Sequence, residues 1–171
     1  MVFTLVACGG EEKASEEGNV KEINIAVSPD YPPYESLDTD GKTIVGFDAD
    51  MIALFPEYLN DGDTTYKFVW HSMSFENIVS QVQGGQVDIG VSGFTYDKSR
   101  KVAWSKPYTA TAQVAVVDKD SDIKTVKDLE GKTVAAQSGS NGEKAAKEIK
   151  DANVVSVTNV QEIFSSLTSK Q

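Results

Sequence analysis

An α/β fold built on parallel sheets is predicted by two observations. Short apolar runs alternate with amphipathic segments from Lys21 onward, and the first of them follow the order strand, helix, strand, helix, strand. The same alternation starts again after Pro107-Tyr108, which indicates a second lobe. We therefore expect a first lobe at residues 21–107, a hinge at 108–113 and a partial second lobe at 114–171.

The strands of the first lobe are expected at residues 23–27, 65–70 and 87–91, and its helices at 48–59 and 75–82. Prolines in the loop 29–33 stop the first strand, because proline can neither donate to a β-ladder nor continue a helix. Asp48 is a suitable N-cap for the first helix, which Pro56 is expected to strain or kink. Asp40-Gly41 predicts a turn, and Gly84-Gly85 ends the second helix.

The second lobe is expected to have strands at residues 114–117, 133–136 and 154–157, and helices at 126–129, 140–150 and 161–169. Gly131 closes the first of these helices. The run Ser140-Asn141-Gly142-Glu143 has the spacing of a capping box, in which a serine and a glutamate satisfy free backbone N–H groups at a helix start.

Composition excludes several classes of protein. A formal net charge of −10 argues against nucleic-acid binding, which draws on clustered lysine and arginine. A hydrophobic content of 40% is ordinary for a globular protein and excludes wholesale disorder. Nine acidic residues lie between Ser28 and Asp63, against Lys42 alone. That acidic surface either attracts cations or is simply well solvated.

The N-terminus is expected to lie outside the folded domain. Residues 1–8 form a short apolar run ending in Leu5-Val6-Ala7-Cys8, which resembles the lipobox of bacterial lipoproteins, with Cys8 as the lipidated residue. The run is too short to span a bilayer and has no basic residue, so we expect a signal clipped at its front. The polar stretch 9–20 has the composition of a tether. The alternative is a chance apolar N-terminus.

Arg100 is the one arginine among sixteen basic residues. A guanidinium grips a carboxylate through two parallel hydrogen bonds, which an ammonium cannot do. Arg100 follows an apolar strand and a small polar stretch, and we expect Asp97 to cap a helix with Arg100 one turn in. Because ligands of open α/β sheets bind beyond the carboxyl ends of the strands, Ser92, Gly93, Thr95 and Arg100 are expected to line one crevice. The alternative is an ordinary surface arginine.

Six segments in order carry a resemblance to a known family: Tyr31-Pro32-Pro33-Tyr34-Glu35, Gly46-Phe47-Asp48-Ala49-Asp50, Gly84-Gly85-Gln86-Val87-Asp88, Gly93-Phe94-Thr95 through Arg100, Trp104-Ser105-Lys106-Pro107-Tyr108, and Asp128-Leu129-Glu130-Gly131-Lys132. From about Lys21 to its end, the chain resembles the family 3 solute-binding proteins of ABC importers. The resemblance implies a two-lobed fold of the periplasmic-binding-protein type II class and no cofactor. It also implies an extracytoplasmic protein that is lipid-anchored to the membrane and delivers a polar amino acid to an ABC permease.

The resemblance also implies roles for individual residues. Arg100 corresponds to the family arginine that binds the ligand α-carboxylate, and Ser92, Gly93 and Thr95 to positions that meet its α-amino group. Tyr31 and Phe75 correspond to aromatic walls, although Phe75 also suits the core. In the expected site we further include Ser28, at the end of the first strand, and Ser140 and Asn141, at a helix start of the second lobe. The acidic first lobe favours a cationic ligand such as arginine or lysine, and glutamine and histidine remain open alternatives.

The resemblance leaves other functions open. The family pattern continues beyond a helix like 161–169 into a Gly-x-x-Asp strand, so the chain is expected to be a fragment that binds its ligand weakly or not at all and tends to associate or aggregate. The same fold includes dehydratases of small carboxylic acids, and His71 at a strand end is a poor general base. A receptor sensor domain is a third alternative. Neither a metal cluster nor a nucleophile motif is recognisable.

Overall fold

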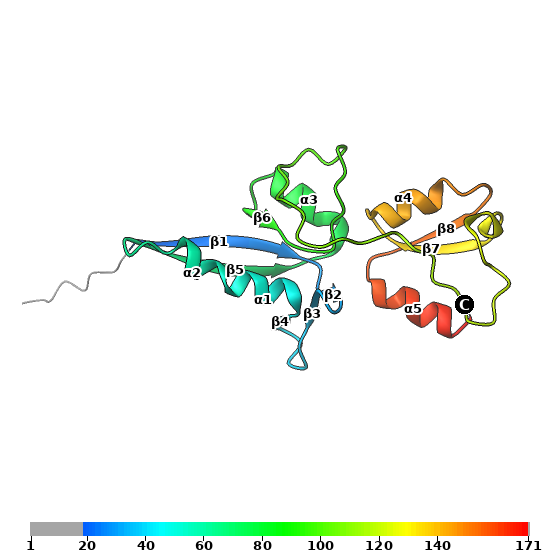
Figure 1. The fold of residues 1–171 in the computed structure, drawn as a ribbon, viewed down its shortest axis with the longest axis horizontal. Helices are drawn as coiled ribbons and strands as arrows, with labels where there is room; N and C mark the ends of the chain where they lie inside the picture. Colours follow the sequence, from blue (N-terminus) through cyan, green and yellow to red (C-terminus); the bar gives the residue numbers. More distant parts are fainter. Residues whose placement is uncertain (1–18, 171) are drawn as a thin grey trace, which may run out of the picture.

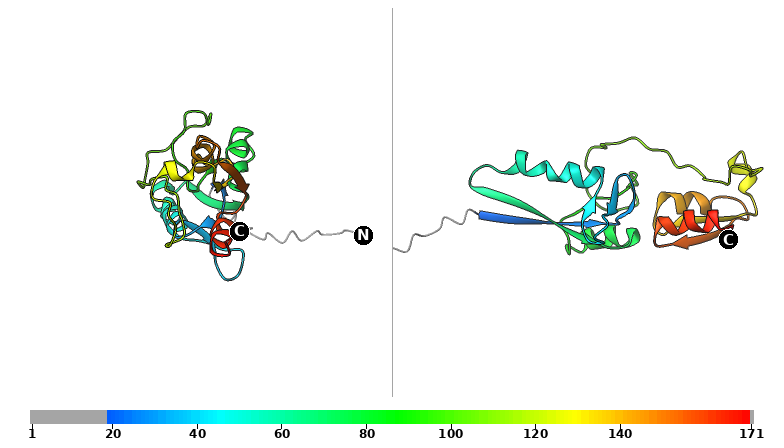
Figure 2. Two further views of the ribbon diagram at one scale, coloured as in Figure 1. Left: turned by 90° about the vertical axis from the view of Figure 1, so that its right-hand side faces the viewer. Right: turned by 90° about the horizontal axis from the view of Figure 1, so that it is seen from below.

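The computed structural model describes residues 19–170, and Figure 1 shows their arrangement. Cys8 and residues 9–18 of the expected tether lie outside the described residues. The elements form two units: an N-terminal unit, from β1 to β6 with helices α1 to α3, and a C-terminal unit, from β7 to α5. The two units lie end to end along the long axis (Figures 1 and 2).

The N-terminal unit is built on a three-stranded parallel sheet. Its strands are β1 (Asn19–Val27), β5 (Thr64–Ser72) and β6 (Ile89–Gly90), in the order β5-β1-β6. Both pairings are parallel, with Ile25 opposite Trp70 on one side and Ile89 on the other. The last residues of β1 are fully buried, as expected for a central strand covered on both faces. The parallel sheet predicted from the sequence is therefore confirmed.

Helices cover this sheet on both faces. Helix α3 (Phe75–Gln83) packs Phe75 and Ile78 against Ala26 and Val87. On the other face, Ile52 packs against Ile25 and Val91. Helix α1 (Phe47–Ala53) stops ahead of Pro56, and α2 (Phe55–Leu59) begins anew with this proline in its first turn. The expected interruption at Pro56 is confirmed, because a proline ring cannot enter an unbroken helix interior.

Asp48 does not cap α1, and that prediction is wrong. The N-cap is Gly46, with φ of 118°, and a Cβ added there would lie 2.5 Å from the Tyr34 carbonyl oxygen. Only glycine fits such a close approach with positive φ. Asp48 is therefore the second residue of the helix, where its side chain is completely buried.

A small antiparallel sheet, which the sequence analysis did not predict, follows β1. Its strands are β2 (Asp30–Tyr31), β3 (Glu35–Leu37) and β4 (Ile44–Val45), in the order β2-β3-β4. The turn between β3 and β4 contains Asp40-Gly41, as predicted, and the Asp40 carboxylate accepts hydrogen bonds from the N–H groups of Lys42 and Thr43. This sheet brings Tyr31 and Glu35 beside the carboxyl end of β6.

The C-terminal unit contains a parallel pair, β7 (Thr133–Gln137) and β8 (Asn153–Val157). Helices α4 (Asn141–Lys147) and α5 (Val160–Thr168) lie on opposite sides of this pair (Figure 1). A 3₁₀ turn, η1 (Val126–Leu129), precedes Gly131. Helix α4 ends three residues before the predicted Lys150, because the chain turns back toward β8.

Residues 91–125 cross from one unit to the other without any helix or strand, and two predictions fail there. Residues 114–117 are not a strand: Val114 is 77% exposed and Val116 56%, and no strand of the described chain pairs with them. Residues 97–100 form a single turn rather than a helix. The Asp97 carboxylate accepts the Ser99 N–H, and the Asp97 carbonyl accepts the Arg100 N–H, but the next turn does not follow.

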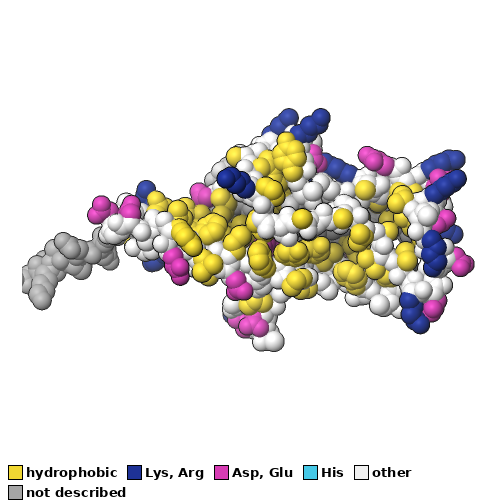
Figure 3. All heavy atoms as spheres, in the orientation of Figure 1, with side chains coloured by type: hydrophobic (Ala, Val, Ile, Leu, Met, Phe, Trp, Pro, Cys, Tyr) yellow, Lys and Arg dark blue, Asp and Glu magenta, His cyan; other side chains and the backbone are white. Residues whose placement is uncertain are grey.

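Among residues 19–170, every helix is too short or too polar to span a bilayer. The face drawn in Figure 3 carries hydrophobic side chains along its middle, from the N-terminal unit into the C-terminal one, and many of its lysines lie toward the C-terminal end.

Candidate functional site

The carboxyl end of β6 continues into a tight turn at Ser92 and Gly93. The buried Ser92 hydroxyl donates to Glu35 Oε1 at 2.5 Å, and the Gly93 N–H donates to the same oxygen at 2.8 Å. The Tyr31 ring lies against Gly93, where an added Cβ would be 3.1 Å from Tyr31 Cδ1. Glycine at this position therefore lets an aromatic side chain lie directly on the backbone.

Arg100 points into the junction between the two units rather than into solvent. Its Nη1 donates to the Thr95 carbonyl at 3.1 Å, and its Nη2 donates to the Gly139 carbonyl in the C-terminal unit at 2.9 Å. The guanidinium carbon lies 5.2 Å from the Phe94 ring centroid and 5.8 Å from that of Phe75. Burial lowers the pKa of Arg100, and the nearby Asp97 charge opposes this shift. The side chain is thus held by two neutral acceptors and two aromatic faces.

Phe75 contributes to both the core and the site. It is buried with Ala26 and Ile78, as the core alternative expects. Its ring also stacks on Phe94, with centroids 4.4 Å apart, and so supports the surface beneath Arg100. Tyr31 is 40% exposed and stacks on Tyr34.

The loop between β7 and α4 approaches the start of α3. Gly139 has φ of 73°, and an added Cβ would lie 3.0 Å from Cα of Glu76. Ser140 is the N-cap of α4, and its Oγ accepts the Glu143 N–H at 3.0 Å. Asn141 Oδ1 is buried and accepts no hydrogen bond from the described residues.

The predicted capping box is formed only in part. The Glu143 carboxylate does not return to the Ser140 N–H, which donates instead to the Gln137 carbonyl. It accepts hydrogen bonds from Lys147 Nζ at 2.7 Å, the Ser156 hydroxyl at 2.5 Å and the Gly139 N–H at 2.9 Å. These donors, Lys147 first among them, lower the pKa of Glu143 to about 2. The Gly139 N–H is one position earlier than a capping box requires.

Two further contacts join the units, and the sequence analysis missed both. Asp30, which also accepts the Ser28 hydroxyl at 3.1 Å, receives hydrogen bonds from Gln137 Nε2 at 2.9 Å and the Val160 N–H at 2.8 Å. Lys144 on α4 forms an ion pair with Asp97, which lowers the pKa of that carboxyl. With the Arg100 to Gly139 bond, these contacts hold the units together around the junction.

The candidate site is therefore a continuous set of contacts at this junction. Tyr31 touches Gly93, Gly93 and Ser92 share an acceptor, and the chain continues through Thr95 to Arg100 and Gly139. Ser28 lies at the end of β1 beside Asp30, and Ser140 and Asn141 follow Gly139. Among the described residues, no cluster of side chains suits a metal ion.

A buried acid cluster adjoins the site and was also missed. Glu35 and Asp48 are both 0% exposed. Burial raises the pKa of Glu35 to about 8 and also raises that of Asp48. Burial and the Asp48 charge raise the pKa of Tyr108, whose ring stacks on Phe47 with centroids 6.0 Å apart. In the sequence, the one sign that these two acids matter is that each lies in a segment that resembles the family.

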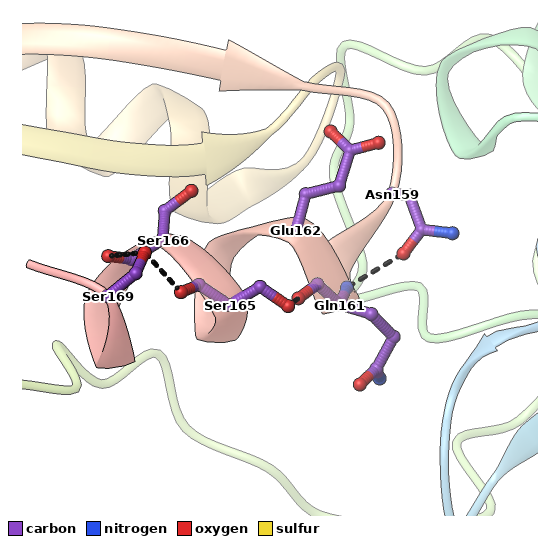
Figure 4. Close-up of a pocket in the computed structure, with 6 residues that line it drawn as sticks. All are labelled: Asn159, Gln161, Glu162, Ser165, Ser166 and Ser169. Carbon is purple, nitrogen blue, oxygen red and sulfur yellow. Dashed lines mark hydrogen bonds between the residues drawn. The ribbon is translucent and has the colours of Figure 1, made fainter. Parts of the chain in front are cut away.

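A hollow on α5 lies away from these residues. It encloses about 650 Å³ and is drawn in Figure 4, where it is lined by Asn159, Gln161, Glu162, Ser165, Ser166 and Ser169. The Ser165 and Ser169 hydroxyls donate to carbonyls of their own helix, so neither hydroxyl proton is free for a ligand. A second hollow of about 440 Å³ lies between α1, α2 and β5 and is mostly apolar. Neither includes a predicted site residue.

Comparison with known proteins gives the wider context. The chain is 34% identical over 151 residues to the arginine-binding extracellular protein ArtP of Bacillus subtilis (strain 168), covering 87% of this chain and 56% of ArtP. Among solved structures, the substrate-binding protein of an amino acid ABC transporter matches with a TM-score of 0.79 and 32% identity, covering 88% of this chain and 66% of that one.

The Gly52Ala mutant of arginine-bound ArgBP from T. maritima matches with a TM-score of 0.76 and 35% identity, over 86% of this chain and 68% of that one. An ancestral amino acid-binding protein, AncCDT-1, described as a precursor of cyclohexadienyl dehydratase, matches with a TM-score of 0.75 and 31% identity, over 86% and 66% of the two chains. These likenesses show the type II periplasmic-binding-protein-like fold that the sequence predicted. This chain spans just over half the length of ArtP.

The family model for bacterial extracellular solute-binding proteins, family 3, matches residues 23–171, and therefore includes both units and every residue of the candidate site. The chain belongs to the bacterial extracellular solute-binding proteins of family 3.

Proposed function

We propose that this protein binds a polar amino acid outside the cytoplasm and presents it to the permease of an ABC transporter. The observation that carries the proposal is that no carboxylate of the described residues pairs with Arg100. Its guanidinium lies at the junction of the two units, and among residues 19–170 only carbonyl oxygens accept its hydrogen bonds. Each ion pair in the described chain involves other residues. A ligand carboxylate would replace neutral acceptors with a charged one, which makes the stronger bond.

The other predicted residues are assigned to the remaining groups of the ligand. Ser92, Gly93 and Thr95 supply carbonyl and hydroxyl oxygens for the α-ammonium group, and the Ser92 hydroxyl, as donor to Glu35, keeps its oxygen free to accept. Tyr31 and Phe75 provide aromatic surfaces for the stem of the side chain. Ser28 is assigned to one side of the ligand, and Ser140 and Asn141, at the start of α4, to the side of the C-terminal unit.

An arginine-like cation is the proposed ligand class. ArtP is named as arginine-binding, and the ArgBP structure is described as arginine-bound. The net charge of −10 favours the approach of a cation over that of an anionic amino acid. Lipidation at Cys8 would keep the protein at the membrane beside its permease.

Binding is proposed to act by closure of two lobes, corresponding to the N-terminal and C-terminal units. Residues 108–113 contain no helix or strand and connect the units, so they are the proposed hinge. The contacts of Asp30, Arg100 and Lys144 all cross between the lobes and would break on opening. A ligand that touches both lobes favours the closed form, which the permease would recognise.

The alternative is a dehydratase, since AncCDT-1, itself an amino acid-binding protein, is described as a precursor of one. Such an enzyme needs an acid or base within reach of its substrate. Glu35 has a suitably raised pKa but is completely buried, and His71 bonds Asn24 on the sheet, away from the site. We therefore propose a binding protein without enzymatic activity.

The test is a thermal-shift panel followed by calorimetry on the full chain. Arginine, lysine, histidine, glutamine and glutamate are compared, and a prephenate-type acid is added with product analysis. We expect a rise in Tm with arginine or lysine and no turnover of the acid. Turnover would establish the enzyme alternative. If no amino acid raises the Tm and calorimetry detects no binding, the proposed function is contradicted.

A further inference from the structure

Glu35 on β3 fixes the turn that follows β6. One carboxyl oxygen, Oε1, accepts both the Ser92 hydroxyl at 2.5 Å and the Gly93 N–H at 2.8 Å. The two donors are consecutive residues, so a single acceptor sets the position of the turn. Because the Glu35 side chain is 0% exposed, solvent cannot replace it in these bonds. The turn is also the part of the candidate site assigned to the ligand ammonium group.

Burial raises the pKa of Glu35, and a second buried carboxyl, that of Asp48, lies close enough for its charge to raise that pKa further. Glu35 Oε2 has no hydrogen-bond donor among the described residues, and neither Asp48 oxygen accepts a well-formed hydrogen bond. The Asp48 N–H donates at 2.9 Å to the carbonyl of Tyr34, the residue before Glu35, which holds the two acids close together. Two ionised carboxylates cannot bond each other, whereas a protonated carboxyl can donate to an ionised one. One proton between them therefore satisfies an oxygen on each side.

We propose that Glu35 and Asp48 share one proton, and that this acid pair positions the Ser92–Gly93 turn for the ligand and releases the turn when the proton leaves. Glu35 is a positioning residue, because it acts through the turn and does not touch the ligand. The binding half of the inference rests on the proposed function. The shared proton does not, because both carboxyls are in place without a ligand.

The surroundings of the pair explain why the proton stays. Glu35 faces Ser92 and Gly93 after β6 and Asp48 on α1, while Tyr108 approaches Asp48 from the connecting segment, with Tyr34 beside it. The ion pairs of the described chain lie elsewhere. Burial is the main cause that raises the pKa of Glu35 to about 8, and the hydrogen bonds from Ser92 and Gly93 oppose it. At neutral pH the pair keeps its proton, and in mildly alkaline solution it loses it.

Loss of the proton leaves two like charges side by side without a donor between them. Asp48 cannot retreat, because the start of α1 is fixed where Gly46 packs on the Tyr34 carbonyl. Glu35 must therefore turn away, and the Ser92–Gly93 turn loses its common acceptor. The ligand ammonium group then meets a displaced turn, so affinity falls. If binding requires the protonated pair, the dissociation constant rises about tenfold per pH unit above the pKa.

The first experiment needs no ligand. Side-chain carboxyl carbons and backbone amides are followed by NMR from pH 4 to 10 in the full chain, and the Glu35 signal is assigned by its absence in Glu35→Gln. We expect a midpoint near 8 for Glu35, with the Gly93 amide shifting at the same midpoint. In Asp48→Asn, whose amide donates without a titrating proton, the Glu35 midpoint moves down. A Glu35 midpoint in the ordinary range overturns the shared proton.

The second experiment measures L-arginine affinity by calorimetry at pH 6.5 and 9. The wild type is expected to weaken about tenfold at pH 9. Glu35→Gln imitates the protonated acid, keeps an acceptor for Ser92 and Gly93, and should bind within about twofold of the wild type at pH 6.5. Because the introduced amide does not titrate, the change in affinity of Glu35→Gln between the two pH values reports titration of the ligand alone. The matched control is Asp50→Asn. Asp50 is an exposed acid on α1, the helix that carries Asp48, and this variant should behave like the wild type.

The outcomes separate the two proposals. No binding of L-arginine or another amino acid by the wild type at pH 6.5 contradicts the proposed function, while the NMR titration still decides the shared proton. Binding with the same pH dependence in the wild type and Glu35→Gln overturns the positioning role. If Glu35→Gln does not fold, the wild-type titration of Glu35 and Gly93 remains decisive, because two separate midpoints would uncouple the pair from the turn.

Discussion

Asp30 on β2 accepts the Val160 N–H at 2.8 Å, so a carboxylate of the N-terminal unit meets the first turn of α5 in the C-terminal unit. The same oxygen accepts Gln137 Nε2, and the Asp30 carbonyl accepts Gln161 Nε2 at 2.9 Å. A negative charge is favourable at a helix N-terminus, where backbone N–H groups lack partners. These bonds exist only while the units are in contact, so their free energy favours the closed form.

We expect Asp30→Ala to weaken amino-acid binding while the N-terminal unit stays folded. Hydrogen bonds to charged groups are each worth about 1.5–3 kcal/mol, so losing the contact should raise the Kd by about tenfold or more. Calorimetry with L-arginine measures the effect. Asp63→Asn removes an exposed acid from the same unit and should leave the Kd unchanged. An equal Kd in Asp30→Ala and the wild type would show that closure does not depend on this contact.

Arg100→Lys should lose most of its affinity. Lysine keeps the positive charge but cannot present two parallel donors, nor lie flat on Phe75 and Phe94. The expected rise in Kd is at least about tenfold, measured by calorimetry at pH 6.5. Lys98→Ala, which removes an exposed cation two residues away, is the control. An unchanged dissociation constant in Arg100→Lys would remove the arginine from the ligand site.

Gly139→Ala tests whether the loop before α4 must approach α3. The added Cβ would lie 3.0 Å from Cα of Glu76, and a φ of 73° adds backbone strain of about 1–2 kcal/mol. Gly131→Ala has nearly the same φ, 68°, but its Cβ would meet no atom of the described part of the chain within 4 Å. Both variants should lose similar stability in urea unfolding, while only Gly139→Ala loses ligand affinity. Equal affinities would mean that the bound form leaves room at this junction.

The regular elements of the sheets were predictable because their signals are local. The strands around residues 23–27, 65–70 and 133–136 are apolar runs bounded by turn residues, and a helix with Pro56 inside must break. Residues 114–117 read equally well as a strand, yet a strand needs a partner, and in the described chain they have none. Local pattern cannot supply that information.

The candidate site was predictable only as far as its chemistry is local. Arg100 attracts notice as a lone arginine after a strand. Asp30, Glu35 and Asp48 look like solvated acids in an acidic stretch, and their roles come from contacts remote in sequence. Glu35 meets Ser92 across 57 residues, and Asp30 meets Val160 across 130. Burial of a carboxyl is decided by the whole fold, which periodicity does not reveal.

The stability of the ligand-free protein should fall as pH rises from about 5 to 8. The unfolded chain releases the Glu35 proton near its ordinary pKa of 4.5, whereas the folded protein holds it to about 8. Between these values the folded state binds more protons, so the free energy of unfolding decreases by up to about 1.4 kcal/mol per pH unit. The decline should level off above pH 8, where both states are ionised.

Urea unfolding at half-unit pH steps measures this decline, and Glu35→Gln should flatten it because the amide does not titrate. Asp50→Asn, which changes an exposed acid on α1, should retain the wild-type slope. Glu143 acts in the opposite sense: its pKa is lowered, so its contribution is lost only as pH falls toward about 2. The two carboxyls therefore act in separate pH ranges, and a wild-type slope in Glu35→Gln would assign the decline to another group.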